Sequence, residues 1–136
     1  MKNFSIIIFL FLFSNVFGQY VKPDERTSES KIYSIVAEQP QPEGGMGKFY
    51  RFINNEMNYP EEAIKAGIEG RVFVQFVVDE EGNIPQESIK VVQGVHPLLD
   101  EETVRLISIS DPWEPGKKEN GDPAAVRMIL PITFKL

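Results

Sequence analysis

The chain has 136 residues, a formal net charge of −6 at pH 7 and no cysteine. The lack of cysteine excludes disulfides, thiolate metal sites and cysteine nucleophiles, so core packing must supply the stability. An acidic chain without a basic cluster is a poor ligand for nucleic acids and anionic membranes, and neither is expected as a partner.

Residues 1–18 have the pattern of a signal peptide. Lys2 gives a positive start, segment 6–13 is an unbroken apolar run, and Gly18 is the small residue before an expected cut at Gln19. The apolar stretch is shorter than the roughly 20 residues that a membrane-spanning helix needs. We therefore expect export of a one-domain mature chain, with an uncleaved membrane anchor as the alternative.

Residues 19–45 have the composition of a polar tail followed by a turn-rich connector. The charged run up to Lys31 predicts a flexible tail. Segment 31–38 alternates weakly between apolar and other residues, which favours a short strand. Proline and glycine are frequent in segment 39–45, so a connector is expected there.

Two helices are expected at the start of the domain, which we place over residues 46–136. Apolar residues recur at helical spacing in segment 47–56. Tyr59 and Pro60 open a second, shorter helix, in which Pro60 takes the first helical position and Gly67 supplies a left-handed stop.

The strongest interior strand is expected at 71–78, where valine and phenylalanine recur at every second position. A reversal at 79–83 leads to a second strand at 88–93. A helix is predicted over 97–108 and ends before Pro112. The helix residues expected to face the sheet are Leu99, Thr103, Leu106 and Ile107.

The closing segment, residues 126–136, alternates strictly between the two faces of an extended strand. Pro131 lacks the N–H that a strand ladder needs, and prolines in sheets are confined to edges and bulges. If the even positions pair inward, Pro131 leaves a donor missing only on the open side. The sequence therefore predicts an edge strand, to which a partner can add a strand of its own.

The order helix, strand, strand, helix, strand is typical of an α+β fold. We expect a small three-stranded antiparallel sheet with helices packed on one face. The last strand is expected to pair with segment 71–78, because these two long alternations match in length. The resulting strand order is 2-1-3, with the last strand exposed at one edge.

Catalytic and metal sites find little support in the sequence. His96, the single histidine, lies just before Pro97 at a helix start, which favours a structural role over a general base. Segment 100–102 is acidic and falls in the first helical turn, where carboxylates complement the helix dipole. We expect no enzyme activity, cofactor, metal or small-molecule substrate. Trp113, the single tryptophan, is expected to cover the core.

Five short segments occur in an informative order. They are Tyr59-Pro-Glu-Glu-Ala63, Gly70-Arg-Val-Phe-Val-Gln-Phe-Val-Val-Asp79 with Gly82, Pro97-Leu-Leu-Asp-Glu-Glu102, Trp113-Glu-Pro-Gly-Lys117 and Leu130-Pro-Ile-Thr-Phe134. Together they make the region from Tyr59 to Leu136 resemble the C-terminal domain of the TonB energy-transducer family. The helix at 47–56 and the Pro42-Glu-Gly-Gly45 segment before it look like an extension found in many members.

This resemblance implies a periplasmic binding module. In the TonB family this domain captures an extended segment of outer-membrane receptors by strand addition to its last strand. Carried over to matching positions, the resemblance implies a partner-binding site made by the following residues: Arg127, Ile129, Thr133, Lys135, Tyr59 and Pro60. The expected partner is an extended segment of an outer-membrane TonB-dependent receptor or a related protein.

Two further interpretations stay open. A full transducer has a membrane helix and a long spacer, whereas this chain has a cleavable-looking leader and a tail that reaches only roughly 40 Å. A stand-alone domain is therefore expected, and an uncleaved leader instead implies a membrane-tethered transducer. The same edge strand can also pair with its twin, which makes a homodimer the structural alternative.

Overall fold

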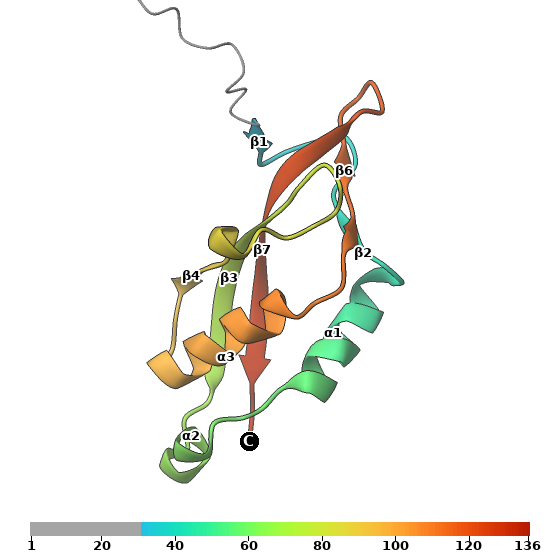
Figure 1. Cartoon of the computed structure of the whole chain (residues 1–136). Helices are drawn as coiled ribbons and strands as arrows, with labels where there is room; N and C mark the ends of the chain where they lie inside the picture. The colour runs from blue at the N-terminus through green and yellow to red at the C-terminus, as the bar shows by residue number, and fades with distance from the viewer. Residues whose placement is uncertain (1–30) are drawn as a thin grey trace, which may run out of the picture.

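Residues 31–136 are described by the computed structural model, so the predicted signal peptide (1–18) and the first part of the predicted tail (19–30) lie outside the described residues. Three helices pack on one face of a sheet (Figure 1). The helices are α1 (Gly45–Glu56), α2 (Glu61–Ala66) and α3 (Pro97–Ser108), with a short 3-10 helix, η2 (Gln86–Ser88). The strands are β1 (Ile32–Tyr33), β2 (Gln41–Pro42), β3 (Gly70–Val78), β4 (Lys90–Gln93), β5 (Trp113–Glu114), β6 (Gly116–Lys117) and β7 (Pro123–Phe134).

The sheet is built around the antiparallel pair of β3 and β7, which runs from Gly70 opposite Phe134 to Val78 opposite Val126. The strand order is β1-β7-β3-β4, and β6 pairs with the start of β7. Strand β1 runs parallel to β7, so the sheet is mixed. Strands β2 and β5 form a separate two-stranded ribbon.

This topology confirms the α+β class and the pairing of the last strand with the strongest interior strand. The predicted three-stranded antiparallel sheet was wrong, because β1 and β6 add two short strands to β7. Each of them has two residues. A short strand was expected in segment 31–38, where β1 lies, but its pairing with β7 was not, and β6 is too short to display an alternation.

The core lies between the sheet and the helices. Every second residue of β3, from Val72 to Val78, is fully buried on the helix side. The four residues of α3 that were predicted to face the sheet are all buried. Trp113 is 4% exposed, as expected of a residue that covers the core. The other large side chains that are fully buried come from α1, α3 and β7: Ile53, Leu99, Leu106, Ile107, Ile132 and Phe134.

Two element boundaries differ from the prediction. Strand β7 begins at Pro123, because its first residues pair with β6 and β1. Helix α2 begins at Glu61, and Pro60 precedes it as an extended residue whose carbonyl accepts the N–H of Ile64 at 3.0 Å. Gly67 ends α2 in the left-handed conformation, with φ of 65°, as predicted.

Candidate functional site: the outer edge of the last strand

The strands that lie beside β7 change along its length. Strand β6 pairs with Pro123 and Ala124, and β1 pairs with Ala125 and Val126. At residues 127–134, β7 pairs on its inner side with β3, and no second strand of the described part pairs on its outer side. We call this outer side of residues 127–134 the open edge. Helix α1 lies beside it in Figure 1, on the side opposite β4.

The backbone groups that face the open edge belong to the odd-numbered residues. In an antiparallel strand, alternate residues direct their N–H and C=O to opposite sides. The Tyr50 hydroxyl of α1 donates to the carbonyl of Pro131 at 3.2 Å, so this odd residue faces away from β3. Ile129 and Thr133, two positions to either side, therefore also direct their backbone groups outward. Pro131 lies between them without an N–H to offer.

Tyr50 was not expected at this edge. Its ring packs edge-on against Phe49 at 5.4 Å between centroids, which fixes the direction in which the hydroxyl points. Burial raises the pKa of the Tyr50 phenol, although the nearby Arg71 charge opposes part of that shift. The hydroxyl is therefore protonated at neutral pH and able to donate. Among the described residues, no strand pairs with the outward groups of Ile129 and Thr133, and the Pro131 carbonyl is already contacted by helix α1.

Side chains of the odd residues lie on the sheet face opposite the core. Ile129 is 54% exposed, and Arg127 and Thr133 are also exposed. Lys135 follows the last paired residue of β7 and is exposed too. These four predicted site residues therefore lie along one strand, with two cations flanking an apolar and a hydroxyl side chain. A guest strand on the open edge would run beside them.

Tyr59 and Pro60 lie at the far end of the same strand. The Tyr59 ring packs edge-on against Phe134 at 5.7 Å between centroids, and its hydroxyl donates to the carbonyl of Ile68. Both groups of Tyr59 are thus engaged within the domain. Pro60 supplies the first carbonyl of α2. The structure brings Tyr59 near the end of β7, where it supports the strand from the core side.

A buried carboxylate fixes the segment before Tyr59. Glu102 is 6% exposed and accepts the backbone N–H of Asn58 at 3.0 Å. Arg105 pairs with the same carboxylate and also donates to the carbonyl of Glu56 at 2.8 Å. This pairing raises the pKa of Arg105. Glu102, which was expected to complement the helix dipole, also joins α3 to the segment that follows α1.

His96 has the structural position that was expected for it. Its Nδ1 accepts the backbone N–H of Leu98 at 3.1 Å and caps the start of α3. In residues 31–136, histidine and acidic side chains form no group of three that could hold a metal ion. No helix among the described residues is both long and apolar enough to cross a membrane.

The comparisons with known proteins point to one family. The family model for the C-terminal domain of the Gram-negative bacterial TonB protein matches residues 55–136. The solution structure of the C-terminal domain of Helicobacter pylori TonB, residues 179–285, is 27% identical with a TM-score of 0.51, and the match covers 67% of this chain and 79% of that one.

The structure of the HasB C-terminal domain is 21% identical, with a TM-score of 0.40, and the match covers 89% of this chain and 94% of that one. The search of curated proteins finds no match.

Proposed function

Because the chain belongs to the TonB C-terminal family, whose domains are periplasmic in Gram-negative bacteria, we propose that it binds an extended peptide by strand addition to the open edge of β7. The partner is an extended segment of an outer-membrane TonB-dependent receptor or a related protein. The observation that carries this proposal is the unpaired outer side of β7 at residues 127–134, among the described residues.

The outward backbone groups of Ile129 and Thr133 are suited to be the main bonding positions. Each offers one N–H and one C=O, and the two residues are four positions apart, which matches the spacing of a strand ladder. A net contribution of about 0.5–1.5 kcal/mol for each hydrogen bond gives a guest strand modest affinity before side chains contribute. The Ile129 side chain, 54% exposed, supplies apolar contact to the guest.

Binding is proposed as the whole activity, without catalysis. The guest is bound by backbone groups, and the exposed side chains beside it select its sequence. Export by the predicted signal peptide 1–18 would put the domain where receptor segments are within reach. Neither the leader nor residues 19–30 belong to the described part of the chain.

Titration with receptor-derived extended peptides tests this proposal. Ile129→Pro removes an outward N–H and leaves the inward pairing to β3 intact, so we expect affinity to fall about tenfold with little change in the fold. Ile129→Ala is the matched control, because it keeps the N–H and removes only side-chain contact. Its loss of affinity should be smaller. If no receptor-derived peptide binds the wild-type protein, the proposal fails.

Self-pairing of two open edges is the competing interpretation. A symmetric dimer would place the same strand of each copy side by side. Sedimentation of residues 19–136 over a range of concentrations distinguishes the two, because self-pairing gives a mass that rises with concentration. A monomer at all concentrations removes the dimer, and a dimer that Ile129→Pro dissociates would replace peptide capture as the explanation of this edge.

The N-terminal residue of the protein recovered from cells decides a further point. A chain that starts at Gln19 is a free periplasmic module. A chain that still starts at Met1 would be membrane-tethered, and an energy-transducing role would then replace the stand-alone one.

A further inference from the structure

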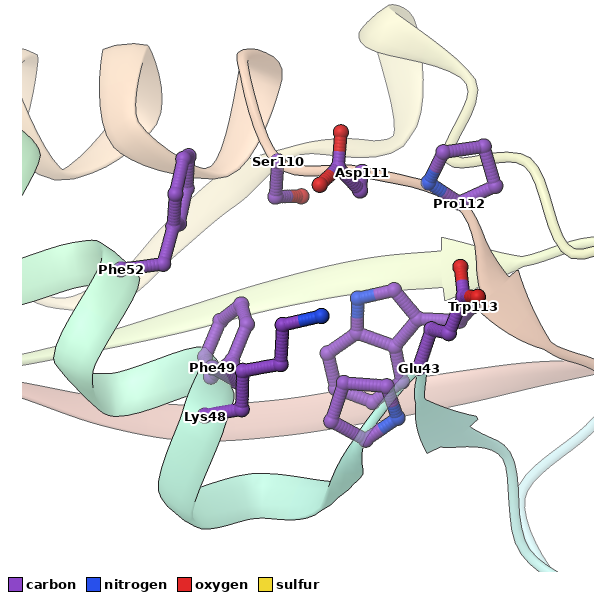
Figure 2. Close-up of a pocket in the computed structure, with 9 residues that line it drawn as sticks. Glu43, Lys48, Phe49, Phe52, Ser110, Asp111, Pro112 and Trp113 are labelled. Carbon is purple, nitrogen blue, oxygen red and sulfur yellow. The ribbon is translucent and has the colours of Figure 1, made fainter.

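A small hollow lies away from the open edge, between α1 and the segment that joins α3 to β5. Its volume is about 50 Å³. Figure 2 shows Phe49 and Phe52 of α1 on one side and Pro112 and Trp113 on the other. Because Trp113 forms one wall, we call this space the indole hollow. None of the residues proposed for peptide capture on β7 lines it.

The indole of Trp113 is held rigidly. Its ring packs edge-on against Phe49 at 5.3 Å and against Phe76 at 5.4 Å between centroids. Its backbone pairs with Pro42 in the ribbon of β2 and β5. These contacts hold the indole N–H in a direction in which it meets no acceptor among the described residues, although a buried tryptophan N–H normally has one.

The indole N–H is the one buried side-chain donor of the described residues that lacks a partner. Figure 2 shows the indole nitrogen facing the space between Lys48, Phe52 and Ser110. The Ser110 hydroxyl already donates to the carbonyl of Ile107 at 2.8 Å. A donor fixed at the wall of a hollow, with no acceptor of its own, is suited to bind an oxygen atom brought by a ligand.

The charges around the hollow select a neutral acceptor. One cation, Lys48, and two carboxylates, Glu43 and Asp111, lie around it. A carboxylate ligand would meet two like charges and only one opposite charge, and it would also lose its hydration. A peptide carbonyl has neither penalty and matches a single N–H donor.

The remaining walls are two aromatic rings and two prolines, Phe49, Phe52, Pro42 and Pro112. Proline-rich segments in the polyproline conformation dock into such aromatic-lined grooves, and their exposed carbonyls accept hydrogen bonds there. About 50 Å³ exceeds the roughly 10–15 Å³ that one water needs, so the hollow can take part of a proline ring while the rest of the ring stays outside it.

We infer that the indole hollow binds a proline ring of an extended partner segment, with the Trp113 N–H donating to the adjacent peptide carbonyl. This site goes beyond strand addition on β7 and does not depend on it. It gives the domain a second point of attachment for a proline-containing chain.

The single tryptophan makes the test direct, because an ¹⁵N-labelled protein has one indole N–H resonance. The probe is a blocked peptide of six prolines, and a blocked glycine–serine peptide of equal length is the control. We expect the proline peptide to move the indole resonance saturably, with a dissociation constant in the region of about 1 mM for so small a contact. The control peptide should leave the resonance unchanged.

Variants assign the effect to this site. Trp113→Phe keeps an aromatic ring and removes the donor. We therefore expect the affinity for the proline peptide, followed by the backbone amide shifts of the neighbouring residues, to fall at least about tenfold. Phe52→Ala removes a half-buried wall and keeps the resonance, which provides a second test if Trp113→Phe does not fold. Lys65→Met on α2 is the control, because it changes a lysine that does not line the hollow, and it should bind the proline peptide as the wild type does.

Three outcomes overturn the inference. The first is that the indole resonance does not move with the proline peptide, and the second is that it moves equally with the glycine–serine peptide. The third is that the N–H is already bonded to a water that the peptide does not displace, so that the hollow holds a bound water only. Ile129→Pro separates this site from the open edge, because it should leave the indole response unchanged. Failure of one proposal therefore leaves the other standing.

Discussion

The two halves of β7 differ in the strands that lie beside them, because β3 pairs with β7 only from Val126 onward. Residues 123–126 have β6 and β1 beside them, whereas residues 127–134 have no second strand among the described residues. The burial of the side chains differs between the same two halves of the strand. Ala124, Ala125 and Val126 are all buried, so both faces are covered, whereas Ile129 is 54% exposed on the face away from the helices.

Side-chain size explains why the first half could be covered. Ala124 lies opposite Gly116 of β6, and a Cβ on Gly116 would come within 2.7 Å of Val126 and 3.0 Å of the Glu38 carbonyl. Such close approach is open only to small residues. In the second half, Pro131 removes a donor from the ladder, and exposed side chains flank it. A single strand thus combines a closed segment that anchors it with an open one that can bind.

A proline in each half should show the largest difference between them. Ala125 has the same outward parity as Ile129, but its outer side pairs with β1. Ala125→Pro therefore removes a donor from a buried pair and should lower the free energy of unfolding by about 1–3 kcal/mol. Ile129→Pro should change it by less than about 1 kcal/mol, since no described partner is lost. Urea unfolding of both variants measures this, and equal losses would mean that the two halves are not different.

The long helices and strands of this fold could be predicted from the sequence, because their apolar residues recur with a strong period. Strand β3, helix α3 and the paired part of β7 each repeat their apolar residues over several turns or pleats. The direction of the Pro131 backbone could also be predicted from the sequence, because a missing N–H is tolerated only on the side of a strand that has no partner. The family resemblance drawn from five short segments is confirmed by the match over residues 55–136.

The strands that cover the first half of β7 could not be predicted from the sequence, for a physical reason. A short strand was expected in segment 31–38, but two-residue strands such as β1 and β6 carry no pattern that predicts their pairing with β7. The contact of Tyr50 with Pro131 spans 81 positions, and the bond from Asn58 to Glu102 spans 44. Such contacts depend on tertiary packing, so a local pattern cannot reveal them. The aromatic run at Phe49 and Tyr50 gave the only local signal.

The contact of Tyr50 with Pro131 provides the next sharpest test. The hydroxyl occupies a carbonyl that a guest N–H could otherwise use, so the two compete. Tyr50→Phe should tighten binding of extended peptides about two- to tenfold, the equivalent of one hydrogen bond. Tyr59→Phe is the control, because it breaks the bond to Ile68 and leaves the Pro131 carbonyl as it was. Calorimetric titration of both variants measures the difference, and weaker binding by Tyr50→Phe would mean that the hydroxyl assists the guest.

The cations beside the open edge should have a smaller effect. Arg127 and Lys135 are exposed, so each contributes about 0.2–1 kcal/mol to binding an acidic peptide. Charge reversal to Glu at both positions should weaken such a peptide by a few-fold at low salt, and the loss should largely disappear near 1 M salt. Lys65→Glu on α2 serves as the matched change of charge away from the edge. A loss that salt does not reduce would point to altered structure instead of screened attraction.

The smallest expected effect is an alkaline weakening of the contact between α1 and the open edge. Burial raises the pKa of Tyr50 in the folded state above its ordinary value near 10, so the folded protein holds this proton more tightly than the unfolded chain. The stability from this group is therefore complete below about pH 10 and is lost as pH rises through the folded pKa. The pKa of Tyr59 is raised in the same way, so Tyr50→Phe is needed as the reference that isolates the effect of Tyr50.

The free energy of unfolding between about pH 9 and 11 should fall more steeply in the wild type than in Tyr50→Phe, because a phenolate cannot donate to the Pro131 carbonyl. Parallel curves would mean that this hydrogen bond does not hold α1 against β7 in solution.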